Sequence, residues 1–508
     1  MIGGKIIYLC TKIVFSLCIT IFTLIGFPME EHKLPHPLIA LLPVVLLICF
    51  VSVAVFLFGG DALNGASQMA LVFATAFCLL LGKLVVNSHW HDFEKHLHKN
   101  FKNISGALLI LFIIGSLSAT WMMSGVVPMF IVYGMKIIHP AVFLLAACVI
   151  SALVSVLTGS SWTTIATIGI ALLGIGIALG FSPGWIAGAI ISGAYFGDKI
   201  SPLSDTTVLA SSISGTPLFT HIRYMLITTI PSFVISLVVF AIAGLMMTQQ
   251  VMTDTLLYEE ILTSKFNFSY WLLLVPAITI FMIIKRYPPL VTLFLSMLIA
   301  LIFTLVFQRD LLFEVAGSAE RSLTGLIKGS LITTFGSTAI ETGNSEINAL
   351  VATRGMQGML NTVWIIICAT CFGAAMTSTR MIESLTQALI RKIHNTPGLV
   401  GSTVFTGLLA NLTMGDQYLG LILTGNMFKH LYEQKGYENR LLSRTLEDSV
   451  TVTSVLVPWN SCGMTQSTVL GVSTLIYLPY AVFNYISPVM SVVVALLRYK
   501  IVQKRGDT

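Results

Sequence analysis

The feature that most constrains how this chain can fold is a run of charged residues between long apolar stretches. Residues 193–212 read GAYFGDKISPLSDTTVLASS and contain two carboxylates, Asp198 and Asp205, one ammonium group, Lys199, and a row of hydroxyls. Two apolar stretches flank the charges: Gly184–Phe196 and Met225–Met247. Each stretch predicts a membrane helix. The charged run therefore lies at or near membrane depth, where ionisable side chains are costly and usually functional.

Composition places most of the chain in a membrane. Of its 508 residues, 56% are hydrophobic and only 10% are charged, whereas a soluble domain carries about 25% charged residues. Apolar segments of about 20 residues span a bilayer, and the sequence predicts roughly eleven to thirteen of them, with breaks at Pro and Gly. We therefore expect an all-α polytopic membrane protein without a soluble domain.

We expect one membrane domain built from two halves. The predicted segments are an N-terminal helix and loop (1–36), a first transmembrane half (37–247), a connecting segment (248–267), and a second half with a short basic tail (268–508). The apolar segment Ile6–Phe27 could be a signal peptide, but no convincing small-residue cleavage site follows it. An uncleaved first helix is favoured.

The charges and the cysteines argue against other classes of protein. The net charge of +6 is spread over loops, so we expect no nucleic-acid partner, which would need a basic face. The excess of Lys and Arg suits cytoplasmic loops. The eight cysteines lie mostly in apolar runs, which argues against a disulfide framework. Cys368 and Cys371 have a redox spacing, but we predict that they pack within a helix.

Two polar features allow more than one interpretation. Residues 87–103 contain four histidines, which could bind a metal ion or respond to pH near neutrality. We favour a basic amphipathic helix at the cytoplasmic membrane edge. Residues 430–444 are predicted to be a second charged cytoplasmic loop. Glu341 is either a residue of a helix-end loop, which we favour, or a buried acid.

Pro202 is predicted to break the helix that carries the two acids. It lacks a backbone donor and clashes with the preceding turn, so a continuous helix through it is unfavourable. A broken membrane helix frees carbonyl and amide groups that must face protein or water, and such breaks form ion sites in secondary transporters. We expect Asp198 and Asp205 to converge there. Gly193 and Gly197, four residues apart, predict close approach of a neighbouring helix.

The second half repeats this arrangement loosely. In the first half, TGSSWTT at 158–164 precedes an apolar span, and then come acids, hydroxyls and Pro202. In the second half, NLTMGD at 411–416 precedes an apolar span, followed by Glu447, Asp448, hydroxyls, Pro458 and Asn460. Interrupted segments at matching positions in two halves are the best indication of a transporter site in a sequence.

Two runs resemble the signatures of a known family. GAYFGDKISPLSDTTVLAS, from Gly193, closely resembles a signature of the NhaC-type sodium/proton antiporter family, within the ion transporter superfamily. LEDSVTVTSVLVPWNSCG, at 446–463, is similar to the corresponding signature in that family's C-terminal half. TGSSW at 158–162 is a further likeness, and the resemblance extends over residues 37–496.

The resemblance implies both a fold and an activity. The implied fold has two repeats of inverted topology with broken helices at the midplane, and the implied activity exchanges Na⁺ for protons. The chain departs from the family at FGAAMT, residues 372–377, where many members carry a Glu after FGG. This departure bears on the stoichiometry and on the choice of cation.

The chemistry of the two breaks suits such an exchange. Sodium is a hard cation that prefers oxygen ligands, and burial raises the pKa of a carboxyl group, so one carboxylate can hold either a cation or a proton. We predict that the cation- and proton-binding residues are Asp198, Ser201, Ser204, Asp205, Thr206, Asp416, Asp448, Thr451, Thr453, Ser454 and Asn460. Among these, Asp198, Asp205 and Asp448 are the predicted Na⁺ ligands. We predict supporting roles for Ser161, Thr163, Lys199, Pro202, Glu447 and Pro458.

Several of these residues have structural alternatives. Lys199 could neutralise one acid and leave Asp205 or Asp448 to titrate, or its amine could extend to the membrane interface. Asp198 and Asp205 could belong to ion pairs that hold the broken helix together. Glu447 and Asp448 could instead stabilise the start of a helix.

The sequence thus predicts a secondary antiporter that exchanges sodium, or in its place lithium, for protons across the bacterial cytoplasmic membrane. We expect no cofactor; the expected partners are small inorganic cations and the lipid bilayer, and the chain could form a homo-oligomer. The main alternative is a sodium- and proton-coupled organic-acid exchanger of the malate–lactate type. An organic anion would need a cationic partner, for which Lys199 is the only plausible intramembrane residue.

Two other classes are disfavoured. Phe196-Gly-Asp198 faintly resembles the Gly-Asp motif of intramembrane aspartyl proteases, but no Tyr-Asp pair accompanies it, and we expect no enzymatic activity. A passive channel is a further class, but the matching halves and buried acids favour alternating access over an open pore.

Overall fold

The computed structural model describes residues 34–59, 62, 64–247, 255–318, 321–391, 393 and 395–501, and these residues are mostly helical. Their only bridge of β type is an isolated antiparallel pair, Thr338 and Thr353. The predicted first helix, Ile6–Phe27, lies outside the described residues.

The first half of the described chain forms helices that begin and end at recognisable signals. Prolines in the first turn of α2, α6 and α9 preset the backbone for a helix start. The helices are α2 (Pro37–Phe58), α3 (Ala66–Val86), α4 (Trp90–Met123), α5 (Val126–Ile137), α6 (Pro140–Thr158), α7 (Ser161–Thr164), η2 (Ile165–Gly169), α8 (Ile170–Ala178), α9 (Pro183–Ile200), α10 (Asp205–Ser214) and α11 (Leu218–Met247).

The second half contains more short and bent pieces. They are α12 (Thr255–Lys265), η3 (Tyr270–Leu273), α13 (Leu274–Ile284), α14 (Pro289–Phe307), α15 (Arg309–Ala316), α16 (Leu323–Phe335), α17 (Ser345–Val351), η4 (Gln357–Met359), α18 (Leu360–Ser378), α19 (Met381–Ile390), α20 (Thr396–Met414), α21 (Gln417–Gln434), α22 (Asn439–Leu446), η5 (Glu447–Thr451), η6 (Ser454–Leu456), α23 (Ser461–Leu470), α24 (Thr474–Tyr477), η7 (Leu478–Tyr480) and α25 (Val482–Leu496).

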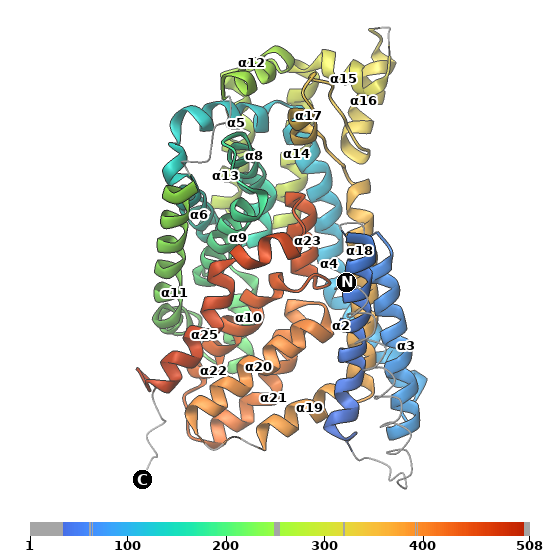
Figure 1. Cartoon of the computed structure of the whole chain (residues 1–508), viewed down its shortest axis with the longest axis vertical. Coiled ribbons are helices and arrows are strands. Elements are labelled where there is room, and N and C mark those ends of the chain that lie inside the picture. Colours follow the sequence, from blue (N-terminus) through green and yellow to red (C-terminus); the bar gives the residue numbers. More distant parts are fainter. Residues whose placement is uncertain are drawn as a thin grey trace, which may run out of the picture.

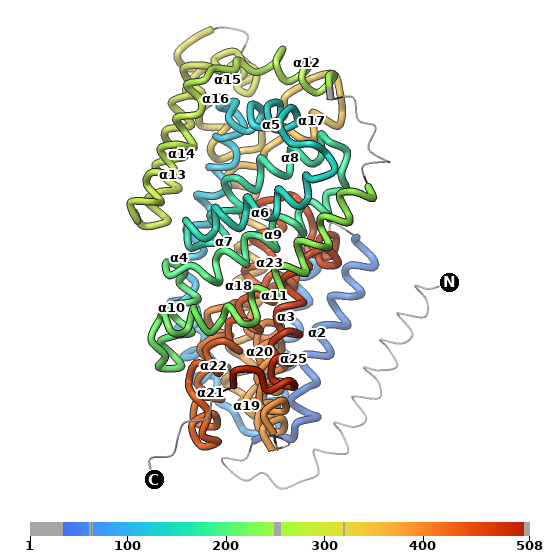
Figure 2. The backbone as a smooth tube through the Cα atoms, turned by 90° about the vertical axis from the view of Figure 1, so that its left-hand side faces the viewer, coloured from blue at the N-terminus to red at the C-terminus, as the bar shows by residue number. Residues whose placement is uncertain are grey.

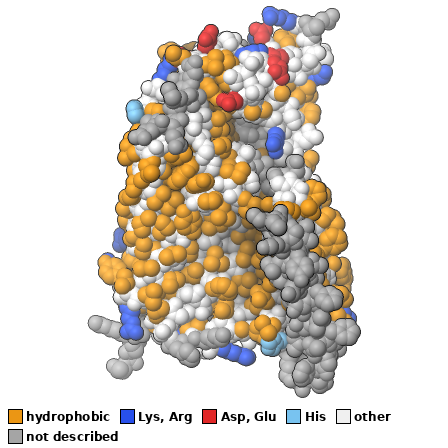
Figure 3. Space-filling view, viewed as in Figure 1, with side chains coloured by type: hydrophobic (Ala, Val, Ile, Leu, Met, Phe, Trp, Pro, Cys, Tyr) orange, Lys and Arg blue, Asp and Glu red, His pale blue; other side chains and the backbone are white. Residues whose placement is uncertain are grey.

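The outer surface suits a lipid bilayer. Within the described residues, eight helices are long and apolar enough to cross a membrane, or ten if two bent pairs each count as one span. Figure 3 shows hydrophobic side chains over the body of the molecule, while acidic and basic side chains gather at its upper end and basic ones at its lower end. The chain is therefore an all-α polytopic membrane protein.

The span count is lower than the eleven to thirteen predicted from the sequence. The predicted first helix lies outside the described residues, and several apolar segments fold as shorter pieces. One such break separates α9 from α10, and another separates η6 from α23. Interrupted helices are too short to count as single spans, so the lower number of spans agrees with the predicted breaks within the membrane.

The two halves contain matching series of helices, α6–α11 and α20–α25. In each series the first helix ends at a left-handed glycine, Gly159 or Gly415, and the next helix starts after a side-chain cap. The following helix then breaks, at Pro202 or at Pro458. The directions are opposite: α5 leads into α6 near the upper end, whereas α19 leads into α20 near the lower end (Figures 1 and 2). The domain boundaries stay a prediction.

Small residues let α6 and α9 approach closely, as predicted from the glycine spacing. A Cβ atom on Gly193 would lie 2.0 Å from the carbonyl oxygen of Cys148, and one on Gly197 would lie 2.3 Å from that of Ala152. Any side chain there would overlap the backbone of α6. The contact places the acid-bearing end of α9 at a fixed position against its neighbour.

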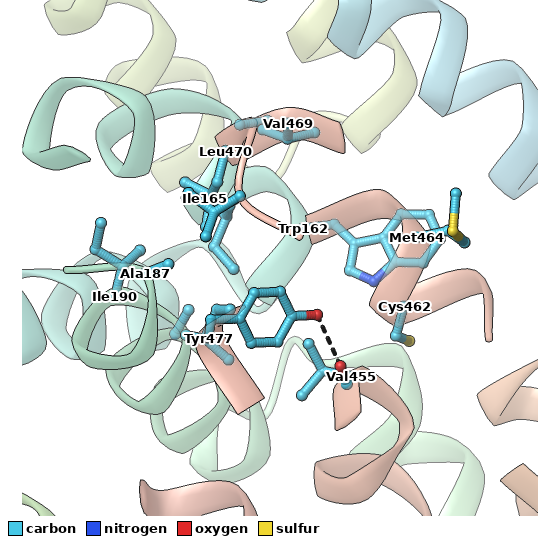
Figure 4. Packing of buried hydrophobic residues seen from close by; sticks show 14 of the residues in the cluster. Trp162, Ile165, Ala187, Ile190, Val455, Cys462, Met464, Val469, Leu470 and Tyr477 are labelled. Carbon is cyan, nitrogen blue, oxygen red and sulfur yellow. Dashed lines mark hydrogen bonds between the residues drawn. The ribbon is translucent and has the colours of Figure 1, made fainter. Parts of the chain in front are cut away.

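Segments from both halves share one core. In Figure 4 the ring of Tyr477, from the second half, lies near Ile165 and Ile190 of the first half, and its hydroxyl donates to the carbonyl of Val455 at 2.8 Å. Trp162 lies near Cys462 and Met464 in the same view. The starts of α7 and α23 are therefore held together by buried apolar contacts.

Two sequence-based expectations need adjustment, and a third is confirmed. Residues 90–103 are not a separate surface helix but the first turns of α4. Residues 430–444 are not one loop, because α21 continues to Gln434 and α22 starts at Asn439. Glu341 is exposed in a loop and accepts a hydrogen bond from Asn348 at 2.9 Å, which confirms the favoured interpretation over a buried acid.

We predict that Gly193→Ala destabilises the protein, because its new methyl group must displace the backbone of α6. Overpacking of this kind costs about 1–3 kcal/mol or more. Thermal unfolding of purified protein in detergent, followed by size-exclusion chromatography, measures the effect. Gly401→Ala is the matched control, since Gly401 is also helical and a Cβ there would meet nothing within 4 Å. Equal unfolding temperatures for the two variants would contradict the proposed contact.

Candidate functional site

The helix that carries the first pair of acids is broken where the sequence predicts. α9 ends at Ile200, Ser201 is extended, and Ser204 caps the start of α10 by accepting from the amide of Thr207. Thr207 donates its hydroxyl to the freed carbonyl of Lys199 at 3.0 Å. The hydroxyl of Ser201 donates to the carbonyl of Val156 at 2.8 Å. The hydroxyls in this run therefore replace part of the lost helical hydrogen bonding.

A cavity of about 250 Å³ opens beside this break. Both acids of the break line it, together with hydroxyl groups of the first half and three residues of the second half. The lining residues are Asn103, Gly106, Ala107, Ile110, Thr158, Gly159, Ser160, Trp162, Thr163, Asp198, Leu203, Ser204, Asp205, Thr206, Pro289, Gln417 and Tyr418. No Lys, Arg or His is among them, so the cavity favours a positively charged occupant.

Asp198 is the buried acid of this cavity. Its carboxylate accepts a hydrogen bond from the amide of Ser161 at 2.9 Å. Ser161 is the first residue of α7, so the carboxylate faces the positive end of a helix dipole. The hydroxyls of Ser161 and Ser204 and the charge of Asp205 also act on Asp198. Asp198 is therefore both bonded to the start of α7 and part of the cavity lining.

Asp205 lies at the open side of the cavity. It is the first residue of α10, and its side chain is exposed. An adjoining cavity of about 240 Å³ shares Thr158, Thr163 and Asp205 with the first, and Arg286 borders it. The structure thus brings Asp198 and Asp205 to one cavity, as predicted, but not into an ion pair with a basic residue.

Lys199 points to a different cluster from its neighbour Asp198. Its amine forms a salt bridge with Asp448 and donates to Ser487 at 3.0 Å. Thr228 and Ser487 also donate to the same oxygen of Asp448, at 3.0 and 3.2 Å. Lys199 and Asp448 are completely buried, which excludes the alternative that the amine reaches the interface.

Arg444 adds a second base to this cluster. The sequence placed it at the edge of a charged loop, but the structure buries it completely on α22. Its Nε lies 3.8 Å from the other carboxylate oxygen of Asp448, and its guanidinium lies 4.8 Å from the ring centre of Tyr224. The spacing of four residues between Arg444 and Asp448 is the signal that sequence reasoning missed.

The second break repeats the pairing of a carboxylate with a helix start. Asp416 caps α21, accepting from the amides of Tyr418 and Leu419 at 2.9 and 3.1 Å, and from the hydroxyl of Ser461 at 2.9 Å. Asp416 is buried and does not line the cavity, whereas the next residues, Gln417 and Tyr418, do. Those two residues were not predicted as site residues, although they directly follow the predicted NLTMGD run.

The remaining predicted residues of the second half lie in a buried network. Asn411 donates to the carbonyl of Val450 and to the hydroxyl of Thr453, and Asn460 donates to the carbonyl of Asn411. Ser454 donates to the carbonyl of Thr451 at 2.7 Å. These residues are not in the cavity lining, so their contacts position the broken helix, whose turn contains Pro458.

Three residues with predicted supporting roles in the first half lie at the cavity or at the break in the helix. Thr163 lines the cavity, Ser161 donates to Asp198, and Pro202 lies in the break.

Glu447 is buried in η5, and no hydrogen bond reaches its carboxyl group. No group of three His, Cys, Asp or Glu side chains in the described chain is placed to hold a metal ion, so neither the four histidines nor the acids form such a cluster there.

The buried charges of the described residues do not balance. Four acids are buried, Asp198, Asp416, Glu447 and Asp448, against two bases, Lys199 and Arg444. If all six were ionised, the interior would carry two uncompensated negative charges. Burying unpaired charges is strongly unfavourable, so protons or cations must neutralise the excess.

Comparison with known proteins places this arrangement in a family. Residues 193–497 match the model of the Na⁺/H⁺ antiporter family. The Na(+)/H(+) antiporter NhaC of Alkalihalophilus pseudofirmus is 34% identical over 89% of this chain and 95% of its own length. The chain belongs to the Na⁺/H⁺ antiporter family.

Two further relatives show what the family includes. The Na(+)/H(+) antiporter NhaC of Bacillus subtilis is 34% identical over 80% of this chain and 88% of its own length. The malate-2H(+)/Na(+)-lactate antiporter of the same organism is 33% identical over 83% of this chain and 87% of its own length. All four buried acids lie within the residues that match the family model.

We predict that Lys199→Met destabilises the protein by about 3–5 kcal/mol, because it leaves Asp448 buried beside a single base. The double variant Lys199→Met, Asp448→Asn should recover part of that loss, since the amide can still accept from Thr228 and Ser487. Thermal unfolding in detergent measures both. The prediction is wrong if Lys199→Met unfolds at the same temperature as the native chain.

Proposed function

We propose that this chain exchanges sodium or lithium for protons across the bacterial cytoplasmic membrane. The observation that carries the proposal is the excess of two buried acids over buried bases, next to a cavity lined by two carboxylates and no base. Membership of the Na⁺/H⁺ antiporter family supports it, as do the two relatives named as such antiporters. A cation and a proton can each neutralise the same excess charge, which is the requirement for exchange.

We assign the cation to Asp198 and Asp205, with the hydroxyls of Ser204, Thr206 and Thr163 as further oxygen ligands. All five residues line the cavity. Oxygen ligands of this kind suit a hard alkali cation. In contrast, the Asp448 carboxylate already forms a salt bridge with Lys199 and accepts hydrogen bonds from Thr228 and Ser487. We therefore assign Asp448 to the structural support of the site.

The orientation that we propose places the lower end of the molecule in the cytoplasm. The start of α4, with its lysines, and the connection between α21 and α22 both lie near that end in Figure 1. Acidic side chains gather near the opposite end (Figure 3). An excess of Lys and Arg on one side is typical of the cytoplasmic side.

One observation favours a second candidate, a sodium- and proton-coupled exchange of organic acids. A relative with 33% identity is a malate-2H(+)/Na(+)-lactate antiporter. Arg286 borders the adjoining cavity that also contains Asp205, and a guanidinium recognises a carboxylate well. Lys199, the residue considered for this role from the sequence, is instead bonded to Asp448. Arg286 is therefore the residue whose loss tests this candidate.

We predict that sodium or lithium alone dissipates a pH gradient in inside-out vesicles that contain this chain. The vesicles would come from antiporter-deficient cells, with a pH-sensitive dye as the readout. Asp198→Asn and Asp205→Asn should each weaken the apparent affinity for sodium by about tenfold or more, since a contact to a charged group contributes about 1.5–3 kcal/mol. Potassium, malate and lactate are tested separately.

Asp310→Asn is the matched control for the two acid variants. Asp310 is highly exposed and pairs with Arg321 far from the cavity, so its loss should leave transport unchanged. Native affinity in both Asp198→Asn and Asp205→Asn would contradict the site. A response that requires malate or lactate together with sodium, and that Arg286→Gln abolishes, would establish the second candidate instead.

A further inference from the structure

Glu447 differs from the other buried acids of the described chain. Asp198 accepts from a backbone amide, Asp416 from two amides and a hydroxyl, and Asp448 from Lys199 and two hydroxyls. Glu447 is completely buried, yet neither of its carboxyl oxygens has a hydrogen-bond partner. The hydroxyl of Thr451, one turn further along η5, is also buried without a partner.

An ionised carboxylate is very unfavourable in such surroundings. Burying a charge without hydrogen bonds costs several kcal/mol, and the group avoids that cost by taking up a proton. The geometry of Glu447 therefore favours the neutral acid in this conformation. A neutral acid also needs no counter-charge, which fits the missing donors around it.

A neutral Glu447 lowers the buried excess of negative charge from two to one. Three buried acids, Asp198, Asp416 and Asp448, then stand against two buried bases, Lys199 and Arg444. The charges of Lys199, Asp198 and Asp448 all act on Glu447, so it lies within electrostatic range of the cavity acid. Ionisation of Glu447 would add one uncompensated negative charge to this group, and a cation bound at Asp198 would compensate it.

We propose that Glu447 carries the exchanged proton, at a position separate from the cation-binding cavity. The proposal rests on the function proposed above and divides its two substrates between two sites. A sodium ion that binds Asp198 cancels the repulsion between Asp198 and an ionised Glu447. Glu447 then loses its proton, which must leave on the side from which the sodium ion entered if the exchange is coupled. The interior gains one Na⁺ and loses one proton, so its charge is unchanged.

The helix geometry gives Glu447 a distinct position from Asp448. The two residues are consecutive in η5, a π-helical turn that continues α22, and π-helical turns are frequent at functional sites. Asp448 is directed to Lys199 on α9, whereas Glu447 is not bonded to that base. One acid thus holds the helices together, and its neighbour remains free to exchange a proton.

Few other charges face Glu447 from the packed elements. Of the helices in contact with η5, α20 and α25 contain no charged residue, α10 contains only Asp205, and the charged residues of α21 lie in its last two turns. α22 contributes Arg440 and Arg444. His221 on α11 bonds to Ser443 and is influenced by Lys199 and Asp448. Besides burial itself, the charges that act on Glu447 are therefore those of Lys199, Asp198 and Asp448.

The test separates proton coupling from cation binding in proteoliposomes that contain the full chain. Glu447→Gln keeps the size of the side chain but cannot carry a proton. We expect it to lose sodium-driven proton movement to the background level and to retain exchange of labelled sodium for unlabelled sodium without a pH gradient. Asp198→Asn should weaken both activities, because both require a bound sodium ion. Asp310→Asn, which changes an exposed acid paired with Arg321, is the control and should keep both.

Glu447→Asp keeps a titratable group, and it tests the proposal if Glu447→Gln does not fold. It should retain antiport with a shifted pH dependence. Three results would overturn the proposal: native sodium/proton antiport in Glu447→Gln, loss of sodium–sodium exchange in folded Glu447→Gln, or an unchanged pH dependence in Glu447→Asp. Failure of the native chain to move protons with sodium or lithium would instead refute the proposed function itself.

Discussion

Acids buried in an apolar interior require donors or positive charges around them, and much of this fold follows from that requirement. A continuous membrane helix has no free backbone donors to offer, because its amides are bonded within the helix. A broken helix does have them. Asp198 accepts from the first amide of α7, and Asp416 accepts from two amides in the first turn of α21. Each half therefore pairs one carboxylate with one helix start, and the same interruption both exposes donors and admits a polar cavity.

The close contact of α6 with α9 makes this arrangement rigid. Gly193 and Gly197 leave the α9 backbone in contact with the carbonyls of Cys148 and Ala152. The end of α9 is fixed by that contact, and its two adjacent charged residues then serve two purposes. Asp198 faces the cavity, while Lys199 binds Asp448 in the other half of the chain. The salt bridge thus links the broken helix of one half to that of the other, next to the cavity.

The sequence predicts the local features of this site better than its long-range contacts. The breaks at Pro202 and Pro458, the close helix contact at Gly193, and the meeting of Asp198 with Asp205 each follow from residues near one another in the chain, and the structure confirms them. The partner of Lys199 is 249 residues away, and the sequence left it open among several acids. The burial of Arg444 and the presence of Gln417 and Tyr418 in the cavity depend on how the halves pack, which no local pattern encodes.

The distribution of charge also limits how exchange can work. A single carboxylate that bound sodium and a proton in turn would need no second unpaired acid nearby. Among the described residues, this interior instead contains two more buried acids than buried bases. One of its acids is Asp198, which lines the cavity, and another is Glu447, whose carboxyl group has no hydrogen-bond donor. In the exchange proposed above, a cation at Asp198 favours loss of a proton from Glu447, because the charge of Asp198 acts on Glu447. Coupling of this kind requires only the repulsion between these two acids. The salt bridge between Lys199 and Asp448 holds the two broken helices together beside them.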